Sequence, residues 1–211
     1  MSVIDDTLPA DSRPIKTKKS NNVLISILVL LGMLILTGIF YPAVVTLISQ
    51  VALQTQAEGS LVQKGEVILG SSLIGQNFGA AQYFHGRPSA AGKTGYDASS
   101  SSGSNLGVYT PEYHALIVKR IADLRLENPD AGAKVPADLV MASASGLDPD
   151  ISKTAAEWEA VRVAKARSIQ LAVVRAIIDQ IAVSGFGISP DRVNVLALNQ
   201  AMDVRYPLKK Q

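Results

Sequence analysis

The chain has 211 residues with 20 basic and 18 acidic side chains, and its net charge of +2 provides no basic surface for nucleic acid. The absence of cysteine excludes disulfide scaffolds, zinc fingers and thiol catalysis. Two histidines are too few for a histidine-rich metal centre. Hydrophobic residues make up 47% of the chain and are most concentrated near the N-terminus.

The N-terminal part predicts a tail followed by a membrane anchor. Residues 1–20 contain two prolines, three aspartates and four basic residues, a composition typical of a disordered tail. No side chain from Ser20 to Ala57 is charged, and the stretch from Val23 to Tyr41 is the most apolar. As a helix this stretch extends about 28 Å, close to the ~30 Å hydrocarbon core of a bilayer. We therefore expect a transmembrane anchor over residues 21–53, with residues 23–41 as its core.

A cleaved signal peptide is the alternative interpretation of the same stretch. Signal peptides have apolar regions of about 7–15 residues and end at an Ala-x-Ala-like site. Here the apolar stretch is longer, and the nearest candidate site, Thr55–Ala57, fits poorly. Four basic residues precede the span, whereas Lys64 is the only one in the 20 residues after Leu53. This asymmetry predicts a cytoplasmic N-terminus and an extracytoplasmic C-terminal domain, by the positive-inside rule.

Residues 54–211 predict one soluble domain of mixed helices and strands. Short apolar runs at 66–69 and 72–74, separated by glycines, favour strands and turns. Residues 89–107 are rich in Ser, Gly and Ala, which indicates a long loop. The expected fold class is α+β: a single N-terminal transmembrane helix followed by one mixed α/β extracytoplasmic domain.

Two helices and two strands are expected in the second half of this domain. Thr110, Pro111 and Glu112 are typical of a helix start, and Asn128-Pro129 of its end. Residues 135–141 favour a strand. A second helix is expected to begin at Ser152 or Thr154 and to end at Gly185. Alternation over residues 193–197 predicts a final strand.

Two segments resemble ligand-binding loops but depart from the required pattern. Gly86 to Thr94 resembles a phosphate-binding loop. However, five residues instead of four separate Gly86 from Gly92-Lys93-Thr94, and Pro88 removes a backbone donor. Asp148 to Glu159 has acidic residues at calcium-loop spacing, but Lys153 occupies the position that requires glycine. A flexible loop and a helix cap account for these residues. We therefore expect the chain to bind no cofactor or metal.

A membrane-anchored serine hydrolase remains open as a different class of function. Ser143 or Ser145 would be the nucleophile, and His85 or His114 the base. The segment lacks the first glycine of a nucleophile elbow, and neither histidine is close in sequence. A turn of small residues before a capped helix is the simpler interpretation.

Several motifs, taken together and in order, resemble the C subunit of the Kdp-type potassium-transporting P-type ATPase, the KdpC family. No single motif would be sufficient, but together they cover nearly all of the chain from residue 37 onward. They are Thr37–Pro42, Val45–Thr46, Ala57–Leu61, Gly70–Gln76, Tyr83–Ala90, Gly103–Gly107, Val135–Val140, Ala142–Ser152, Arg162–Arg167 and Val193–Asn199.

The resemblance implies a non-catalytic accessory subunit of a high-affinity potassium uptake pump in the bacterial inner membrane. The implied partners are a channel-like potassium subunit, the ATP-hydrolysing P-type subunit and a small single-span subunit. Two roles follow from it: an assembly clamp that caps the outer potassium entrance, or a catalytic chaperone that raises ATP affinity through a ternary complex. The predicted extracytoplasmic domain favours the clamp. Residues expected at partner contacts, because they are polar or amphipathic within the matched motifs, are Tyr83, Arg87, Asn105 and Asp148.

Overall fold

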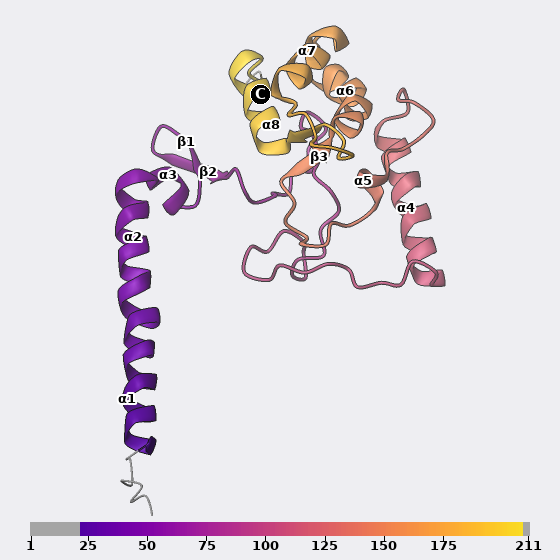
Figure 1. Cartoon of the computed structure of the whole chain (residues 1–211). Helices are drawn as coiled ribbons and strands as arrows, with labels where there is room; N and C mark the ends of the chain where they lie inside the picture. Colours follow the sequence, from indigo (N-terminus) through magenta and orange to yellow (C-terminus); the bar gives the residue numbers. More distant parts are fainter. Residues whose placement is uncertain (1–21, 209–211) are drawn as a thin grey trace, which may run out of the picture. The chain divides into compact units, whose positions relative to one another are not determined.

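The computed structural model describes residues 22–208, which divide into two compact units at Ala57/Glu58 (Figure 1). The tail expected over residues 1–20 lies outside the described residues. The first unit is a continuous apolar helix made of α1 (Asn22–Ile35), a π-helical turn η1 (Leu36–Phe40) and α2 (Tyr41–Ala52). A short helix α3 (Gln54–Ala57) follows. The 31 residues Asn22–Ala52 are long and apolar enough to cross a bilayer, and none is buried within the protein.

The π-helical turn lies directly before Pro42. The Tyr41 N–H donates to the Leu36 carbonyl, five residues back instead of four. Proline has no N–H to donate, and its ring crowds the preceding turn, so a wider turn accommodates it without breaking the helix. The Thr37 hydroxyl donates to the Met33 carbonyl at 2.7 Å, which occupies one more backbone acceptor. The helix therefore continues through Pro42 to Ala52.

The second unit contains short strands and larger helices, which confirms the expected α+β class. A hairpin of β1 (Leu61–Lys64) and β2 (Val67–Ser71) comes first. Residues 72–110 then contain neither helix nor strand. The remaining elements are α4 (Pro111–Glu127), α5 (Ala137–Val140), β3 (Asp150–Ser152), α6 (Lys153–Arg167), α7 (Leu171–Ile181), β4 (Arg192–Asn194) and α8 (Val195–Arg205).

The core is formed by α6, α7, α8 and the antiparallel pair β3–β4, which lie together in Figure 1. Its largest fully buried apolar side chains are Phe84, Ile151, Ile178, Leu198 and Met202. Phe84 is the one member of this set that comes from the irregular segment 72–110. This segment is therefore part of the core.

Several expected elements are confirmed. Helix α4 begins after Thr110, whose side chain accepts the Tyr113 N–H, and it ends at the cap Asn128. The long loop expected at 89–107 is present and extends over 72–110. Ser152 caps α6 through the Ala155 N–H at 3.0 Å, so the earlier of the two expected starts is correct.

Three expectations about secondary structure are wrong. Residues 72–74 contain no strand, because the hairpin ends at Ser71. Residues 135–141 do not form a strand: Pro136 leads into the one-turn helix α5, which buries the consecutive residues Leu139 and Val140. The single helix expected from Ser152 to Gly185 is interrupted at Ser168. This residue adopts the left-handed conformation, and its N–H caps α6 before α7 begins.

The expected strand at 193–197 is only partly correct. Residues 192–194 are extended, but the Asn194 side chain accepts the Ala197 N–H at 3.0 Å and starts α8. Asparagine is a strong N-cap, and this local hydrogen bond competes with strand continuation. Helix α8, which sequence analysis did not predict, supplies five buried residues to the second unit.

Candidate functional site

The backbone of residues 81–85 is held by buried polar side chains from α6 and α8. Asn199 accepts the Phe84 N–H at 2.8 Å and donates to the Phe84 carbonyl at 3.0 Å, as a neighbouring strand would. Glu159 accepts the His85 N–H at 2.8 Å. Arg162 donates to the carbonyls of Ala81 and Tyr83 at 2.6 and 3.0 Å. The segment is not part of a sheet, so these side chains supply the hydrogen bonds that its backbone needs.

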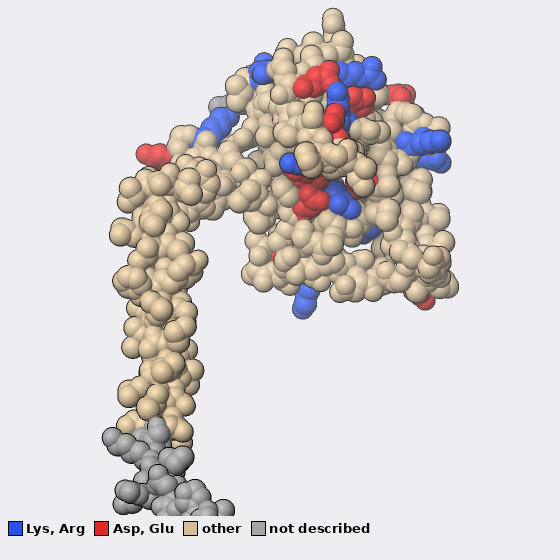
Figure 2. Space-filling view, in the orientation of Figure 1, with Lys and Arg blue, Asp and Glu red and all other residues tan. Residues whose placement is uncertain are grey.

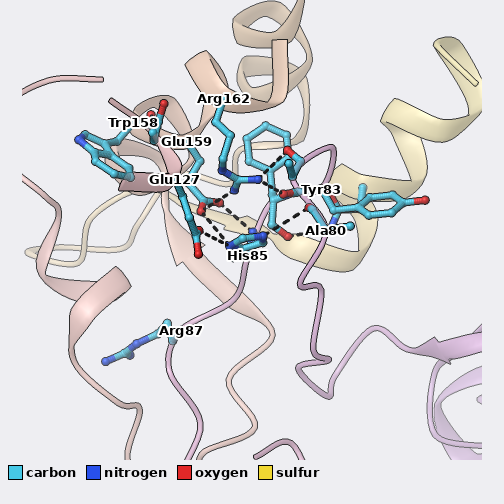
Figure 3. A network of polar contacts seen from close by, with 12 residues as sticks. Ala80, Tyr83, His85, Arg87, Glu127, Trp158, Glu159 and Arg162 are labelled. Atoms are coloured by element: carbon cyan, nitrogen blue, oxygen red, sulfur yellow. Dashed lines mark hydrogen bonds and ion pairs between the residues drawn. The ribbon is translucent and has the colours of Figure 1, made fainter. Parts of the chain in front are cut away.

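Arg162 and Glu159 form a buried ion pair at 2.9 Å, and the His85 ring lies against it (Figure 3). His85 Nδ1 is 3.7 Å from a carboxylate oxygen of Glu159 and 3.7 Å from one of Glu127. Burial and the Arg162 charge lower the pKa of His85 to about 4. Burial outweighs Arg162 at Glu159 and raises the pKa of that carboxyl to about 7. For both groups the low polarity of the surroundings disfavours the charged form.

Arg87 and Asp148 form a second, more accessible ion pair. Arg87 Nη1 donates to Asp148 Oδ2 at 3.0 Å, and both side chains are between a quarter and a third exposed. Asp148 Oδ1 accepts the Asp150 N–H at 3.1 Å, which fixes the carboxylate. Figure 3 shows Arg87 apart from the network around His85. The structure therefore brings together two of the four residues expected at partner contacts.

This pair lines a groove of about 630 Å³. Ser189, Pro190 and Arg192 also line the groove, as does Met141, which is 40% exposed. The groove contains charges of both signs, since Arg87 and Arg192 occur with Asp138, Asp148 and Asp150. Most of these charges are already engaged: Arg192 pairs with Asp150 at 3.3 Å, and Asp138 accepts the Ser152 N–H at 2.7 Å.

The other two expected contact residues have different surroundings. The Tyr83 hydroxyl donates to Asp203 at 3.1 Å, and the Arg167 guanidinium lies 5.2 Å from the centre of the Tyr83 ring. Burial, followed by the Asp203 charge, raises the pKa of Tyr83. Asn105 is exposed and has a left-handed backbone with φ of 53°. Tyr83 therefore fastens the segment to α6 and α8, whereas Asn105 is exposed in an irregular part of the segment.

Comparisons with known proteins identify the family. The family model described as "K+-transporting ATPase, c chain" matches residues 23–204. The chain belongs to the KdpC family. A potassium-transporting ATPase KdpC subunit of Caulobacter vibrioides is 51% identical over 177 residues, which are 82% of this chain and 88% of that one. The corresponding subunit of Beijerinckia indica subsp. indica is 48% identical over 179 residues, covering 83% and 90% of the two chains. That of Escherichia coli is 45% identical over 173 residues, covering 81% and 91%.

In this KdpC-family chain, the segment that resembles a phosphate-binding loop is folded against itself. The Ser89 hydroxyl oxygen accepts the N–H groups of Ala91 and Tyr96 at 3.2 and 2.7 Å and donates to the Gly146 carbonyl at 2.5 Å. A phosphate loop needs such N–H groups free and a helix starting directly after it. The next helix starts only at Pro111.

The candidate calcium loop and two of the candidate hydrolase residues, Ser145 and His85, are also engaged in structural contacts. Glu159 is fully buried with Arg162, and Asp148 is paired with Arg87. Within residues 22–208, no group of three or more acidic or histidine side chains could hold a metal ion. The Ser145 hydroxyl accepts the Leu147 N–H, and the His85 ring lies against Glu127, Glu159 and the Ala80 carbonyl.

Sequence analysis did not predict the roles of Glu159, Arg162 and Asn199. Glu159 was considered only as a calcium ligand, whereas Arg162 and Asn199 belonged to matched motifs without an assigned role. One signal was available: a charged pair three residues apart within an otherwise apolar helix face indicates a buried pair. What that pair holds could not be inferred, because its partners are 74 to 81 residues away.

Proposed function

We propose that this chain is a non-catalytic accessory subunit that assembles and stabilises a potassium-transporting ATPase. Its partners are a channel-like potassium subunit, the ATP-hydrolysing P-type subunit and a small single-span subunit. The observation that carries the proposal is the use of buried charges: Glu159 and Arg162, both almost inaccessible, hold the backbone of the chain's own residues 81–85. These two charged groups are engaged within the fold, which favours an accessory role for them over a catalytic one, since a catalytic group must reach a substrate.

In this proposal, residues 21–53 cross the bacterial inner membrane with the N-terminus in the cytoplasm. The second unit then lies outside and caps the potassium entrance of the channel-like subunit. Support comes from the apolar helix Asn22–Ala52 and from the excess of basic residues before it. The N–H groups of Ala91 and Tyr96 already donate to the Ser89 hydroxyl, which favours this role over direct nucleotide binding. Any effect on ATP affinity would be a coupling between distant sites.

Cysteine labelling in intact cells tests the orientation. Ser100 and Lys134 are exposed, and the chain has no native cysteine, so Ser100→Cys and Lys134→Cys each give one reactive thiol. We expect a membrane-impermeant maleimide to label both before lysis. Labelling of both only after lysis would contradict the outer location and favour the ATP-affinity chaperone role.

The accessory role is tested with the complete ATPase in cells that depend on it for growth at low potassium. We expect deletion of this chain to prevent growth and recovery of the complex. Arg87→Ala should lower co-purification of the other subunits without changing Trp158 fluorescence, because it removes the accessible ion pair. Lys165→Ala removes a more exposed pair with Asp130 and is the matched control. If Ser145→Ala abolished an esterase activity but left growth intact, the hydrolase alternative would replace the accessory role.

A further inference from the structure

The hairpin of β1 and β2 is fastened at its base and exposed at its tip. The Gln76 amide donates to the Leu69 carbonyl at 3.1 Å, and the Ser71 hydroxyl donates to the Gly59 carbonyl at 2.7 Å. Of residues 61–71, none is buried and none belongs to the hydrophobic core of the second unit. A two-stranded hairpin by itself is only marginally stable in water, so this one gains stability when another surface covers it.

The tip of the hairpin exposes apolar side chains on both of its faces. Val67 is 62% and Ile68 57% exposed, and Leu61 at the start of β1 is exposed as well. Val67 and Ile68 are successive residues of β2, so their side chains point to opposite faces of the hairpin. A flat protein surface would cover one of these faces. A fluid apolar layer into which the tip dips covers both.

The hairpin follows the apolar helix closely along the chain. The 31 residues Asn22–Ala52 form a helix about 46 Å long at 1.5 Å per residue. A bilayer with its headgroups is ~40–45 Å thick, so a slightly tilted helix of this length extends from one headgroup region to the other. Leu61 is nine residues beyond Ala52, and Glu58 is the only charged residue between them. The chain therefore keeps the hairpin within about 32 Å of the headgroups at the end of the helix.

We propose that the tip of the hairpin lies in the headgroup region of the bilayer where the helix ends, with Val67 and Ile68 against the upper acyl chains. The inference rests on the proposed function in one respect, because residues 21–53 have to cross the membrane. The exposed turn residues Lys64 and Glu66 remain among water, phosphates and lipid ammonium groups, which solvate both charges. The outer edges of a two-stranded sheet need water, so the hairpin lies no deeper than the hydrated headgroups.

Quenching of a fluorescent label by spin-labelled lipid tests the inference in the complete ATPase. The chain has no native cysteine, so Ile68→Cys and the control Leu126→Cys on α4 each give one thiol for the label, in a complex whose other subunits are made free of cysteine. The nanodiscs contain phosphatidylethanolamine, a minor share of phosphatidylglycerol, and a lipid with a nitroxide on its headgroup. We expect quenching at position 68 to be several times that at position 126. Equal quenching at the two positions would overturn the inference.

A label at Leu34, in the middle of the helix, separates failure of the inference from failure of the proposed function. In the isolated full chain in vesicles, this label should be quenched by a lipid with a nitroxide deep in its acyl chain. No quenching at position 34 would overturn the membrane crossing. Quenching at 34 but not at 68 would overturn the inference alone. Quenching at 68 that disappears in the complete ATPase would assign the hairpin to another subunit and would also overturn the inference.

Substitutions test whether the apolar side chains hold the tip at the bilayer. With the label at Leu61→Cys, we expect Val67→Asp with Ile68→Asp to lower the quenching several-fold. Val67→Leu with Ile68→Leu should preserve it. The control variant Val118→Asp with Leu126→Asp changes two exposed apolar residues on α4 and should leave the quenching unchanged. Unchanged quenching in the aspartate variant of the tip would overturn the inference.

Discussion

The apolar helix 22–52 and the irregular segment 72–110 satisfy their backbone hydrogen bonds in opposite ways. In the helix, partners are four or five residues away, and no side chain of the helix is buried within the protein (Figure 2 shows it free of charged residues). In the segment, His85 and Phe84 bond to side chains 74 and 115 residues away. Changes in the helix should therefore have local effects. Changes at the distant side chains should unfold the segment and the core around Phe84.

The largest effect is expected for Glu159→Ala. It leaves the buried Arg162 charge and the His85 N–H without their carboxylate partner, and breaking a buried pair costs about 3–5 kcal/mol. Urea unfolding of the full chain in detergent, followed by Trp158 fluorescence, measures this loss. Glu157→Ala, at an exposed position of the same helix, is the control and should change stability by less than about 1 kcal/mol. Equal effects of the two variants would show that Glu159 does not hold the segment.

Asn199→Ala should have an effect of similar size. Both backbone groups of the buried residue Phe84 lose their partner, at about 1–3 kcal/mol for each unsatisfied group. The same unfolding experiment measures it, with Gln200→Ala on α8 as control. A loss no greater than for the control would mean that water or another side chain replaces the amide.

The dependence of stability on pH should separate His85 from Glu159. A raised carboxyl pKa stabilises the folded state at low pH, and this contribution is lost as pH rises through about 7. A lowered histidine pKa stabilises the folded state at high pH, and this contribution is lost as pH falls from 6.5 towards 4. The two slopes oppose each other between about 4.5 and 6.5 in the wild type. Glu127 and Arg162 also face the ring and are present in every variant.

His85→Gln should therefore leave a protein that loses stability as pH rises through 7. Glu159→Gln should leave one that loses stability as pH falls below 6.5. Each slope is at most about 1.4 kcal/mol per pH unit. Unfolding midpoints measured from pH 4 to 8 test both, and the same profile for both variants would contradict the assignment.

The smallest effect is expected for Pro42→Ala in the helix. Alanine supplies the missing N–H, so the π-helical turn at Leu36–Phe40 should revert to α-helix. The change in stability should be well below the ~3 kcal/mol that proline costs in a regular helix interior, because the wider turn already accommodates Pro42. Hydrogen exchange of the amides around Tyr41 in detergent measures the change. Persistence of the bond between the Tyr41 N–H and the Leu36 carbonyl would show that proline is not its cause.

Elements with local signals were predicted, and elements with distant causes were not. The caps Thr110 and Ser152 were found because a cap and the N–H group that donates to it lie three residues apart. The break at Ser168 was missed because a serine in the left-handed conformation has no sequence signature. Among the site residues, Arg87 and Asp148 were named from matched motifs. Their contact could not be predicted, since 61 residues separate them.

The sequence alone determined the apolar helix, the α+β class and the family, because each depends on composition, periodicity or the order of motifs along the chain. The tertiary structure alone decided the path of residues 72–110 and the roles of Glu159, Arg162 and Asn199. It also decided the exposure of Val67 and Ile68. The physical reason is the same in each case. A helix satisfies its backbone within one turn, whereas an irregular segment needs partners that only the folded chain brings near.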